Sequence, residues 1–364
     1  MRPAPLPRWR KSKSRHTDPE RLLLVHQHRR SSLYTRRKVL LSSAAVTLLP
    51  WALGRGRAAT GLSFKLFDGH AHLRSEDRLS YPRVAGTPSG GGGPPPAAGP
   101  PPPPAAAGDT PDVDRVLRWM NENGVAGAAA VQHRGTYGYD NRYILNSADQ
   151  HPDRLAPVAV LNAEDPQTPA LIDEWVRSHG LAGVRITGMR GADGSFSWLN
   201  SPQALMTWAA VDNHGLVMDL MTSPPGNSPD AIAAISELAQ QYKRARLVLD
   251  HVAWPDAVGA PDFGLDAPHL KLAGHRNIYY KFSTINLDFL RTAQVPAEDM
   301  LRHVVDVYGA DHVLWGSDIG NSAGPYRDMV SRMMAATVRL KETEKRQVLH
   351  DTGAAVYRRG GVSA

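Results

Sequence analysis

"LFDGHAHL", residues 66–73, is the stretch that decides the fold. It continues an apolar run and places Asp68, His70 and His72 at every second position. Side chains two residues apart on a strand share a face, so both histidines can point into one cavity at a strand end. A plain polar strand end would have the same spacing, and the rest of the chain has to decide between the two interpretations.

Eight apolar segments of strand length recur along the chain, and helix-like stretches separate them. The predicted strands are 63–72, 125–133, 154–161, 181–187, 216–222, 245–251, 277–283 and 312–318. The predicted helices are 111–123, 139–150, 167–179, 201–213, 228–243, 266–275, 296–309 and 324–339. Gly124, Gly180 and Gly215 stand where helices should stop.

Continuous apolar strands indicate a parallel sheet that is buried on both faces. Eight repeats of strand and helix predict an α/β fold, a closed (β/α)8 TIM barrel. A doubly wound open sheet is the alternative. It would require a glycine-rich phosphate loop after the first strand, which "DGHAHLRSED" does not provide.

The charge is distributed unevenly. Residues 1–60 contain 14 Lys or Arg and two Asp or Glu, whereas the remainder has 28 basic and 33 acidic residues. The basic character therefore belongs to the tail, and we expect no nucleic-acid partner for the body. The absence of cysteine excludes disulfides, thiolate catalysis and Cys-ligated zinc.

The tail resembles an export signal. Arg36 and Arg37 precede an uncharged run at 39–53, which is shorter than the roughly 20 residues of a bilayer span and suits a signal-peptide core. Paired arginines before such a run are typical of twin-arginine signals. We expect cleavage near Ala58–Ala59 and a periplasmic protein exported by the twin-arginine machinery, without a stable membrane span. An uncleaved anchor, or a chance basic stretch on a cytoplasmic protein, is the alternative.

The predicted domain organisation is therefore a tail at 1–60 and one barrel domain at 61–364. A Pro/Gly-rich insert at 84–110 interrupts the barrel, and its composition cannot build a packed element. We interpret it as a flexible insertion, with a ligand for a proline-recognition module as the alternative. The sequence does not predict the oligomeric state.

Ionisable residues collect at the predicted strand ends, where the active site of such a barrel lies. They are His70, His72, His133, Arg185, Asp219, Asp250, His251, Lys281 and Asp318. Burying them without partners would be costly, so they predict a metal, a substrate or ion pairs. Two histidines on one strand with His251 and Asp318 can form a four-ligand site of the kind that zinc uses.

Several of these residues have a structural alternative. His133 is compatible with a solvated loop, and Lys281 with an exposed position at the rim. Arg185 and Asp219 can form an ion pair inside the barrel. For Asp250, we expect an outward orientation and a helix cap instead of catalysis.

The motifs together resemble the amidohydrolase superfamily, in its amidohydrolase-related branch around 2-pyrone-4,6-dicarboxylate lactonase and the sugar lactonases. The resemblance rests on "FDGHAHL", "QHRGTYGYDNRY", "LAGVRIT", "LVLDHVAWPD", "VLWGSDIG" and "VLHDTGAAVYR" and extends from about Phe64 to Arg358. Two departures are Ile319-Gly320 in place of Trp-Pro, and Asp219 where other branches have a metal-binding histidine. Because strand 4 also lacks a lysine, a binuclear centre is not expected.

The resemblance implies a hydrolase that opens a lactone or cyclic ester of a carboxylated or sugar-like small molecule. It implies Asp318 as general base, with His251 as the second catalytic residue. One divalent ion, zinc or manganese, would be held by His70, His72 and Asp318, although some members of this branch work without any.

Substrate contacts are expected from Arg185, Lys281, Asn141, Tyr137 and Asp219. Arginine offers bidentate geometry for a carboxylate. Two other functions stay open. One is a metal-dependent non-oxidative decarboxylase, against which "DHVAWPD" stands because decarboxylases carry His-Gly-Gly type sequences there. The other is an exported binding protein that has lost the chemistry.

Overall fold

A computed structural model describes residues 62–84, 110–188, 190–222, 229–256 and 258–359. The predicted tail at 1–60, and all of the predicted insert except its two end residues, lie outside the described residues.

Within that part of the chain, eight parallel strands form one sheet in sequence order. They are β1 (Leu66–Ala71), β2 (Val125–Val131), β3 (Leu155–Val160), β4 (Gly183–Gly188), β5 (Val217–Thr222), β6 (Arg246–Leu249), β7 (Ile278–Ser283) and β8 (Val313–Gly316). Backbone bonds from Asp318 N to His70 O (2.8 Å) and from His72 N to Ile319 O (2.9 Å) link the first strand to the segment after the last. The predicted (β/α)8 barrel is confirmed.

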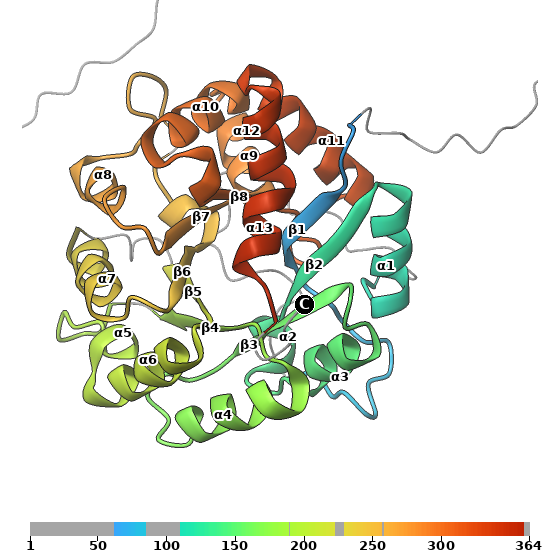
Figure 1. Cartoon of the computed structure of the whole chain (residues 1–364), viewed down its shortest axis with the longest axis vertical. Helices are drawn as coiled ribbons and strands as arrows, with labels where there is room; N and C mark the ends of the chain where they lie inside the picture. Colours follow the sequence, from blue (N-terminus) through green and yellow to red (C-terminus); the bar gives the residue numbers. More distant parts are fainter. Residues whose placement is uncertain (1–61, 85–109, 189, 223–228, 257, 360–364) are drawn as a thin grey trace, which may run out of the picture. The chain divides into compact units, whose positions relative to one another are not determined.

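Helices surround the strands (Figure 1). They are α1 (Val113–Glu122), α2 (Arg134–Tyr137), α3 (Arg142–Gln150), α4 (Thr168–His179), α5 (Ser197–Asn200), α6 (Pro202–His214), α7 (Pro229–Gln241), α8 (Ala267–Leu272), α9 (Thr284–Thr292), α10 (Ala297–Tyr308), α11 (Tyr326–Ala336), α12 (Glu342–Arg346) and α13 (Thr352–Val356). Each of the eight predicted helices is present. Gly180 and Gly215 cap α4 and α6 in the left-handed conformation, as expected. No helix of the described part is long and apolar enough to cross a bilayer.

The strands bury two faces, and each face has its own cluster of apolar side chains. Ala128 and Ala130 of β2 belong to the larger cluster, together with helix residues such as Val116. Ala129 and Val131 belong to the smaller cluster. Because successive strand side chains point to opposite faces, the larger cluster lies between strands and helices and the smaller one fills the barrel.

The inner face changes from apolar to charged along the strands. Val217 is followed two residues later by Asp219, and Val248 by Asp250, all of them buried. The two-residue spacing keeps each pair on the same face. The charged side chains therefore lie inside the barrel, toward the carboxyl ends of the strands.

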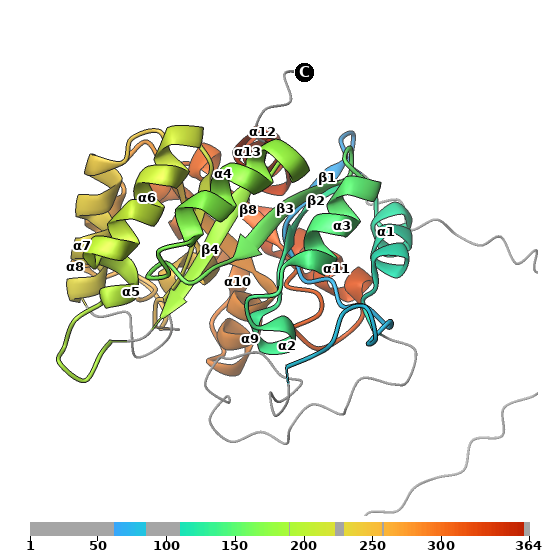
Figure 2. The same ribbon diagram turned by 90° about the horizontal axis from the view of Figure 1, so that it is seen from below.

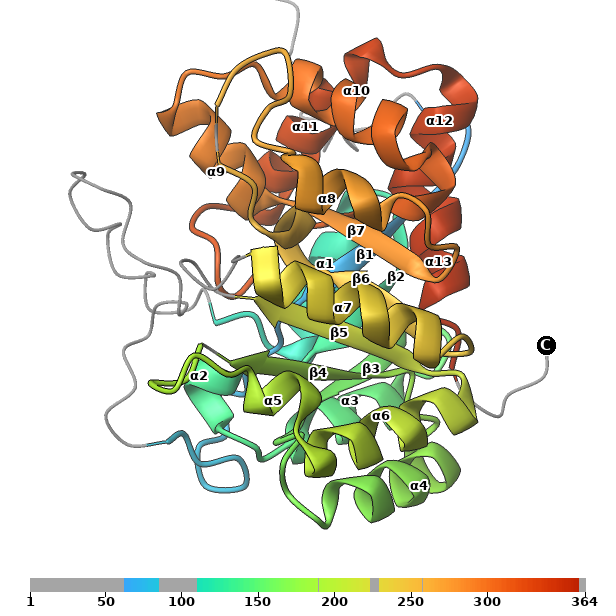
Figure 3. The same ribbon diagram turned by 90° about the vertical axis from the view of Figure 1, so that its left-hand side faces the viewer.

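The short helices mark this end of the barrel. In Figure 2, α2 and α5, which follow β2 and β4, lie on the same side as the tip of β4. In Figure 3, α2 and α9 lie at one end of the strands and α13 at the other. Tyr357, directly after α13, stacks on Phe67 near the start of β1 and packs in the inner cluster. The C-terminal segment thus fills the barrel from the end opposite the predicted site.

Two glycines permit β1 and β8 to approach closely. A Cβ on Gly69 would lie 2.6 Å from Leu314 Cδ1 and 2.7 Å from the Trp315 carbonyl oxygen, and one on Gly316 would lie 2.6 Å from His70 Cβ. Any side chain at either position would push the strands apart. These glycines therefore set the distance between the strand that carries the histidines and the strand that leads to Asp318.

Candidate active site

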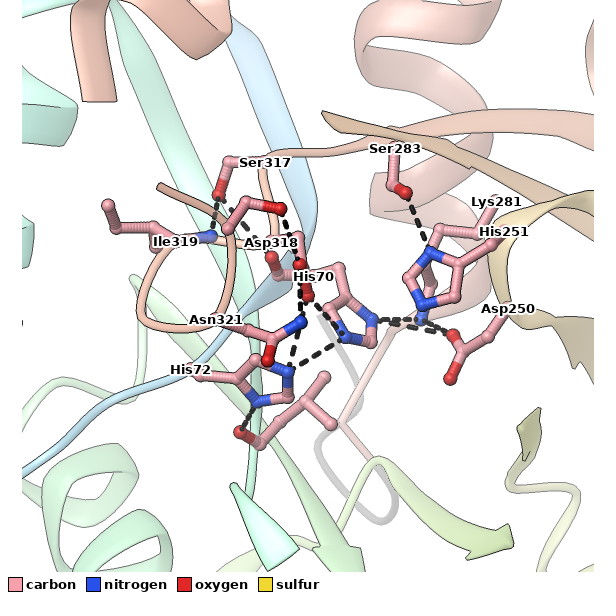
Figure 4. A network of polar contacts seen from close by, with 12 residues as sticks. His70, His72, Asp250, His251, Lys281, Ser283, Ser317, Asp318, Ile319 and Asn321 are labelled. Atoms are coloured by element: carbon pink, nitrogen blue, oxygen red, sulfur yellow. Dashed lines mark hydrogen bonds and ion pairs between the residues drawn. The ribbon is translucent and has the colours of Figure 1, made fainter. Parts of the chain in front are cut away.

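His70 in β1 and His72 directly after it point to the same side, as their spacing predicts, and their rings meet (Figure 4). Both are buried, and their Nε2 atoms lie 3.1 Å apart. His72 Nδ1 lies 2.8 Å from the carbonyl oxygen of Val131, an acceptor, so Nδ1 carries the proton and Nε2 of the neutral ring offers a lone pair. Burial lowers the pKa of His70 well below its ordinary value, and the Lys281 charge lowers it further.

Asp68, the first residue of the alternating triplet, has a structural role. Its Oδ1 accepts hydrogen bonds from the backbone N–H groups of His70 (3.0 Å) and Ser317 (2.8 Å). Its Oδ2 accepts from the Tyr326 hydroxyl at 3.0 Å. Asp68 therefore joins β1 to the end of β8 and to α11, and holds the His70 backbone in place.

Asp318 follows β8 and adopts a left-handed backbone conformation, with φ of 56°. Its Oδ2 accepts hydrogen bonds from Asn321 Nδ2 (2.8 Å) and Ser322 Oγ (2.7 Å). Its Oδ1 has no hydrogen-bond partner among the described residues and lies 3.4 Å from Nε2 of both His70 and His72. An L-residue with this φ is strained, and such strain is common where a side chain is aimed for function.

The Asp318 carboxylate stays ionised in this setting. Burial raises its pKa, but the contact with His72 and the electrostatic interactions with His70 and His251 outweigh burial, so the pKa lies below the ordinary value. A buried, charged oxygen without a donor is suited to accept a proton or to bind a cation.

His251 reaches the same cluster of side chains through an unusual turn. Residues 251–254 all have positive φ, and none of them is glycine. This left-handed turn costs roughly 1–2 kcal/mol per residue, so other contacts must stabilise it. Asn286 Nδ2 donates to the His251 carbonyl at 2.9 Å, and the rings of Trp254 and His70 lie 4.7 Å and 5.6 Å from the His251 ring.

A second contact fixes the proton of His251. Its Nδ1 lies 2.7 Å from Ser283 Oγ, which in turn lies 3.3 Å from Asn286 Oδ1. The hydroxyl has one proton and donates it to Asn286 Oδ1, so it accepts from Nδ1–H and leaves a lone pair on His251 Nε2. Burial lowers the pKa of His251 to about 4, so this neutral ring is the form present near pH 7.

A buried network of four charged side chains contacts His70. Lys281 Nζ contacts Asp219 (3.0 and 3.1 Å), Asp250 Oδ1 (2.9 Å) and His70 Nδ1 (2.8 Å). Arg185 Nε donates to Asp250 Oδ2 at 2.8 Å. Two cations thus neutralise two carboxylates inside the barrel, which the cost of burying charge requires.

The carboxylates of this network titrate differently. Burial raises the pKa of Asp219 to about 6, against the opposing charge of Lys281. Burial also acts on Asp250, but the charges of Lys281 and Arg185 outweigh it and hold its pKa well below the ordinary value. Tyr357 donates its hydroxyl to Asp219 at 2.9 Å from the opposite end of the barrel.

Three structural alternatives from the sequence are wrong. Asp250 faces inward and is fully buried, because it shares the inner face with Val248. Arg185 pairs with Asp250, not with Asp219. Lys281 is 0% exposed and does not lie at the rim.

His133 is also not a solvated loop residue. Its side chain is buried, its Nδ1 lies 2.8 Å from Thr136 Oγ1, and its ring meets the edge of His72 at 5.0 Å. Burial lowers its pKa to about 3, so the ring is neutral. His133 therefore forms part of the wall beside His72.

Tyr137 is the last residue of α2 and Asn141 precedes α3, and the polar groups of both bond to the protein. The Tyr137 hydroxyl accepts from the Ser75 backbone N–H at 2.7 Å. The Asn141 amide donates to the carbonyls of Tyr139 and Val160 and accepts from Val160 N–H. These bonds hold the segment after β2 against Ser75 and against Val160 at the end of β3, and substrate contact by either residue stays a prediction.

The structure adds residues that the sequence did not predict. Ser283 lies two residues after Lys281 on the inner face of β7, so its alternation with Lys281 was a usable signal. Asn286 and Tyr357 carry no comparable signal, because they reach the site from α9 and from the C-terminal segment. All three form hydrogen bonds to other site residues.

The donor set fits one divalent metal ion. His70, His72 and Asp318 offer two ring nitrogens and one carboxylate oxygen that all lie within 4.8 Å of one another. Nitrogen and oxygen ligands of this kind suit zinc. The partnerless Asp318 Oδ1 and the lone pair on His72 Nε2 meet the requirement that ligand atoms be unprotonated.

Sequence comparison places the chain among known proteins. The amidohydrolase family model matches residues 67–359. An L-fucono-1,5-lactonase from Burkholderia ambifaria is 28% identical over 217 residues, which cover 57% of this chain and 70% of that protein.

Solved structures share the fold. A candidate 2-pyrone-4,6-dicarboxylic acid hydrolase from Pseudomonas putida matches with a TM-score of 0.59 and 22% identity, covering 81% of this chain and 98% of that one. An amidohydrolase from Burkholderia multivorans with bound zinc matches with a TM-score of 0.57 and 18% identity, covering 80% and 99%. The family model spans every element of the barrel from β1 to α13, and the chain belongs to the amidohydrolase family.

Proposed function

We propose that this chain hydrolyses a lactone or a similar cyclic ester, with Asp318 as the general base. The observation that carries the proposal is the buried Asp318 Oδ1, which has no hydrogen-bond partner among the described residues and faces His70 and His72 at 3.4 Å. The 28% identity with an L-fucono-1,5-lactonase supports a lactone as the substrate class.

The proton moves through Asp318. Its Oδ1 removes a proton from water as the water oxygen attacks the lactone carbonyl. The protonated carboxyl then returns that proton to the ring oxygen as the carbon–oxygen bond breaks, giving a hydroxy acid. The bonds from Asn321 and Ser322 to Oδ2 hold the carboxylate so that Oδ1 performs both transfers.

The other site residues orient the attacking water or the substrate and polarise the carbonyl group. The neutral His251 ring offers an Nε2 lone pair that can accept from the attacking water or from a substrate hydroxyl. Lys281 donates to His70 Nδ1, which places the His70 proton on Nε2, where it can stabilise negative charge developing on the carbonyl oxygen. A divalent ion held by His70, His72 and Asp318 would supply Lewis-acid polarisation of the carbonyl in its place.

Arg185 points to an anionic or oxygen-rich substrate. It is 8% exposed, and its two terminal nitrogens have no hydrogen-bond partner in the described part of the chain. These donors can bind a carboxylate or a pair of hydroxyl oxygens side by side. This favours a carboxylated or sugar-like lactone over an unsubstituted one.

A substrate panel tests the function. Purified protein is assayed against L-fucono-1,5-lactone, other sugar lactones and 2-pyrone-4,6-dicarboxylate, with the spontaneous hydrolysis rate subtracted. The proposal expects ring opening of at least one compound, with loss of turnover in Asp318→Asn. Carbon dioxide release from aromatic acids without lactone hydrolysis would support the decarboxylase alternative, and a folded protein inactive on every compound would support a binding protein.

We further propose that the chain is exported through the twin-arginine route. The support is sequence alone: Arg36 and Arg37 stand before the uncharged run 39–53. Replacing both arginines by lysine should leave the protein in the cytoplasm of a bacterial host, whereas the same change at Arg29 and Arg30 should not. Periplasmic recovery of the first variant at the wild-type level would contradict the proposal.

A further inference from the structure

Two groups of side chains in the described part of the chain could hold a cation, and they share His70. One group is His70, His72 and Asp318, and the other is His70, Asp250 and His251. The two groups use the opposite nitrogens of the His70 ring, since Nε2 faces Asp318 and Nδ1 faces Asp250, each at 3.4 Å.

The second position already contains a cation of the protein. Lys281 Nζ lies 2.8 Å from His70 Nδ1 and 2.9 Å from Asp250 Oδ1. It also contacts both oxygens of Asp219, at 3.0 and 3.1 Å, and is 0% exposed. In Figure 4 the Lys281 side chain ends between His70 and Asp250.

Charge balance disfavours a further cation at this position. Asp219 and Asp250 are matched by Lys281 and Arg185, all within the buried network. A divalent ion beside them would leave two uncompensated positive charges in the barrel interior, which is strongly unfavourable.

Lys281 also determines which His70 nitrogen carries the proton. An ammonium group has only donors, so His70 Nδ1 must accept and the neutral ring carries its proton on Nε2. A protonated Nε2 cannot bind a metal. For His70 to join His72 and Asp318 around an ion, Lys281 must release Nδ1, and Nδ1–H must turn to Asp250 Oδ1 at 3.4 Å.

We propose that the Lys281 ammonium is a built-in cation that fills the second cation position of this barrel and competes with a divalent ion for His70. The two cation positions in the described barrel therefore hold one divalent ion at most, and Lys281 weakens the binding of that ion. The inference concerns metal binding and does not depend on the identity of the substrate.

The test measures zinc and manganese binding to chelator-stripped protein by calorimetry and by elemental analysis. Wild type should bind no more than one equivalent. Lys281→Met keeps most of the side-chain volume without the charge, and it should bind a second equivalent or bind the first at least about tenfold more tightly, a change on the scale at which outer-shell partners tune metal sites.

Arg185→Met is the matched control. It removes the other cation that contacts Asp250, but Arg185 has no contact with His70 among the described residues. Its zinc affinity should rise less than that of Lys281→Met, because it changes the net charge equally but leaves Lys281 on His70 Nδ1. Two equivalents in wild type, or equal gains in both variants, would overturn the proposal, because the second would reflect net charge alone.

A measurement on wild type covers the case in which Lys281→Met does not fold. Nitrogen-15 spectra of histidine-labelled, metal-free protein distinguish a protonated ring nitrogen from an unprotonated one. The proposal requires His70 to be protonated at Nε2 and unprotonated at Nδ1, and to move the proton to Nδ1 when zinc is added. A metal-free His70 with its proton on Nδ1 would refute it.

Discussion

The Asp318→Asn variant gives the sharpest test of the proposed chemistry, because the structure fixes how the new amide must sit. Asn321 Nδ2 and Ser322 Oγ both lie within 2.8 Å of Asp318 Oδ2. Since Asn321 Nδ2 can only donate, the amide oxygen must take the Oδ2 position. The amide nitrogen then takes the Oδ1 position, 3.4 Å from Nε2 of His70 and His72.

This arrangement preserves the fold and removes the base. Asparagine matches aspartate in size and keeps both bonds at Oδ2, but an amide nitrogen cannot accept the proton of water. General-base catalysis contributes about 10²–10⁴-fold, so kcat should fall by that factor, equivalent to roughly 3–5 kcal/mol in the barrier. Because the backbone of Asp318 is already in the left-handed region, where asparagine is well tolerated, the melting temperature should change little.

The assay is initial-rate lactone hydrolysis followed with a pH indicator, on chelator-treated and on zinc-equilibrated protein. Asp306→Asn is the control, since Asp306 is 61% exposed in an ion pair with Arg302 on α10. It should retain the wild-type kcat. An Asp318→Asn variant that keeps more than about a tenth of wild-type kcat in both metal states would refute the general-base assignment.

Four further predictions concern Ser283, His251, Arg185 and Gly316. Ser283→Ala removes the acceptor of His251 Nδ1–H. It should lower kcat about tenfold, leave KM little changed and reduce the free energy of unfolding by about 1–3 kcal/mol. The control is Thr207→Ala, which removes a buried hydroxyl bonded to a carbonyl outside the site, and equal losses of kcat in the two variants would contradict the positioning role of Ser283. Because burial lowers the pKa of His251 to about 4, the neutral ring persists above that pH. The limb of kcat/KM that reports His251 should therefore lie near pH 4, below the titration of Asp219 near 6, and a profile that stays flat through about pH 4 would argue against a role for the neutral ring. Arg185→Lys should raise KM for carboxylated lactones by roughly 10–100-fold, and no change would remove Arg185 from substrate binding. Gly316→Ala should destabilise the barrel by about 1–3 kcal/mol in denaturant unfolding, since its Cβ would meet His70 Cβ at 2.6 Å; wild-type stability would show that β1 and β8 can separate freely.

The prediction that Asp250 faces outward is wrong for a clear physical reason. Successive side chains of a strand point to opposite faces, so in a regular strand an inward His251 requires an outward Asp250. In the structure β6 ends at Leu249, and the positive φ of His251 reverses the direction of its side chain. Both residues then face inward. Four consecutive non-glycine residues in the left-handed region have no local sequence signal, because the stabilising bond comes from Asn286 on α9.

The sequence alone determined the alternation of eight strands and helices, the shared face of His70 and His72, and the glycines that end helices, because these depend on spacing and on local backbone preference. Only the tertiary structure decided the charge partners: Lys281 meets His70 across 211 residues, and Asp68 reaches Ser317 across 249. A strand pattern states which face a side chain occupies. It does not state which neighbour it meets there, because closure of the barrel sets the register and tilt of strands that are distant in the chain.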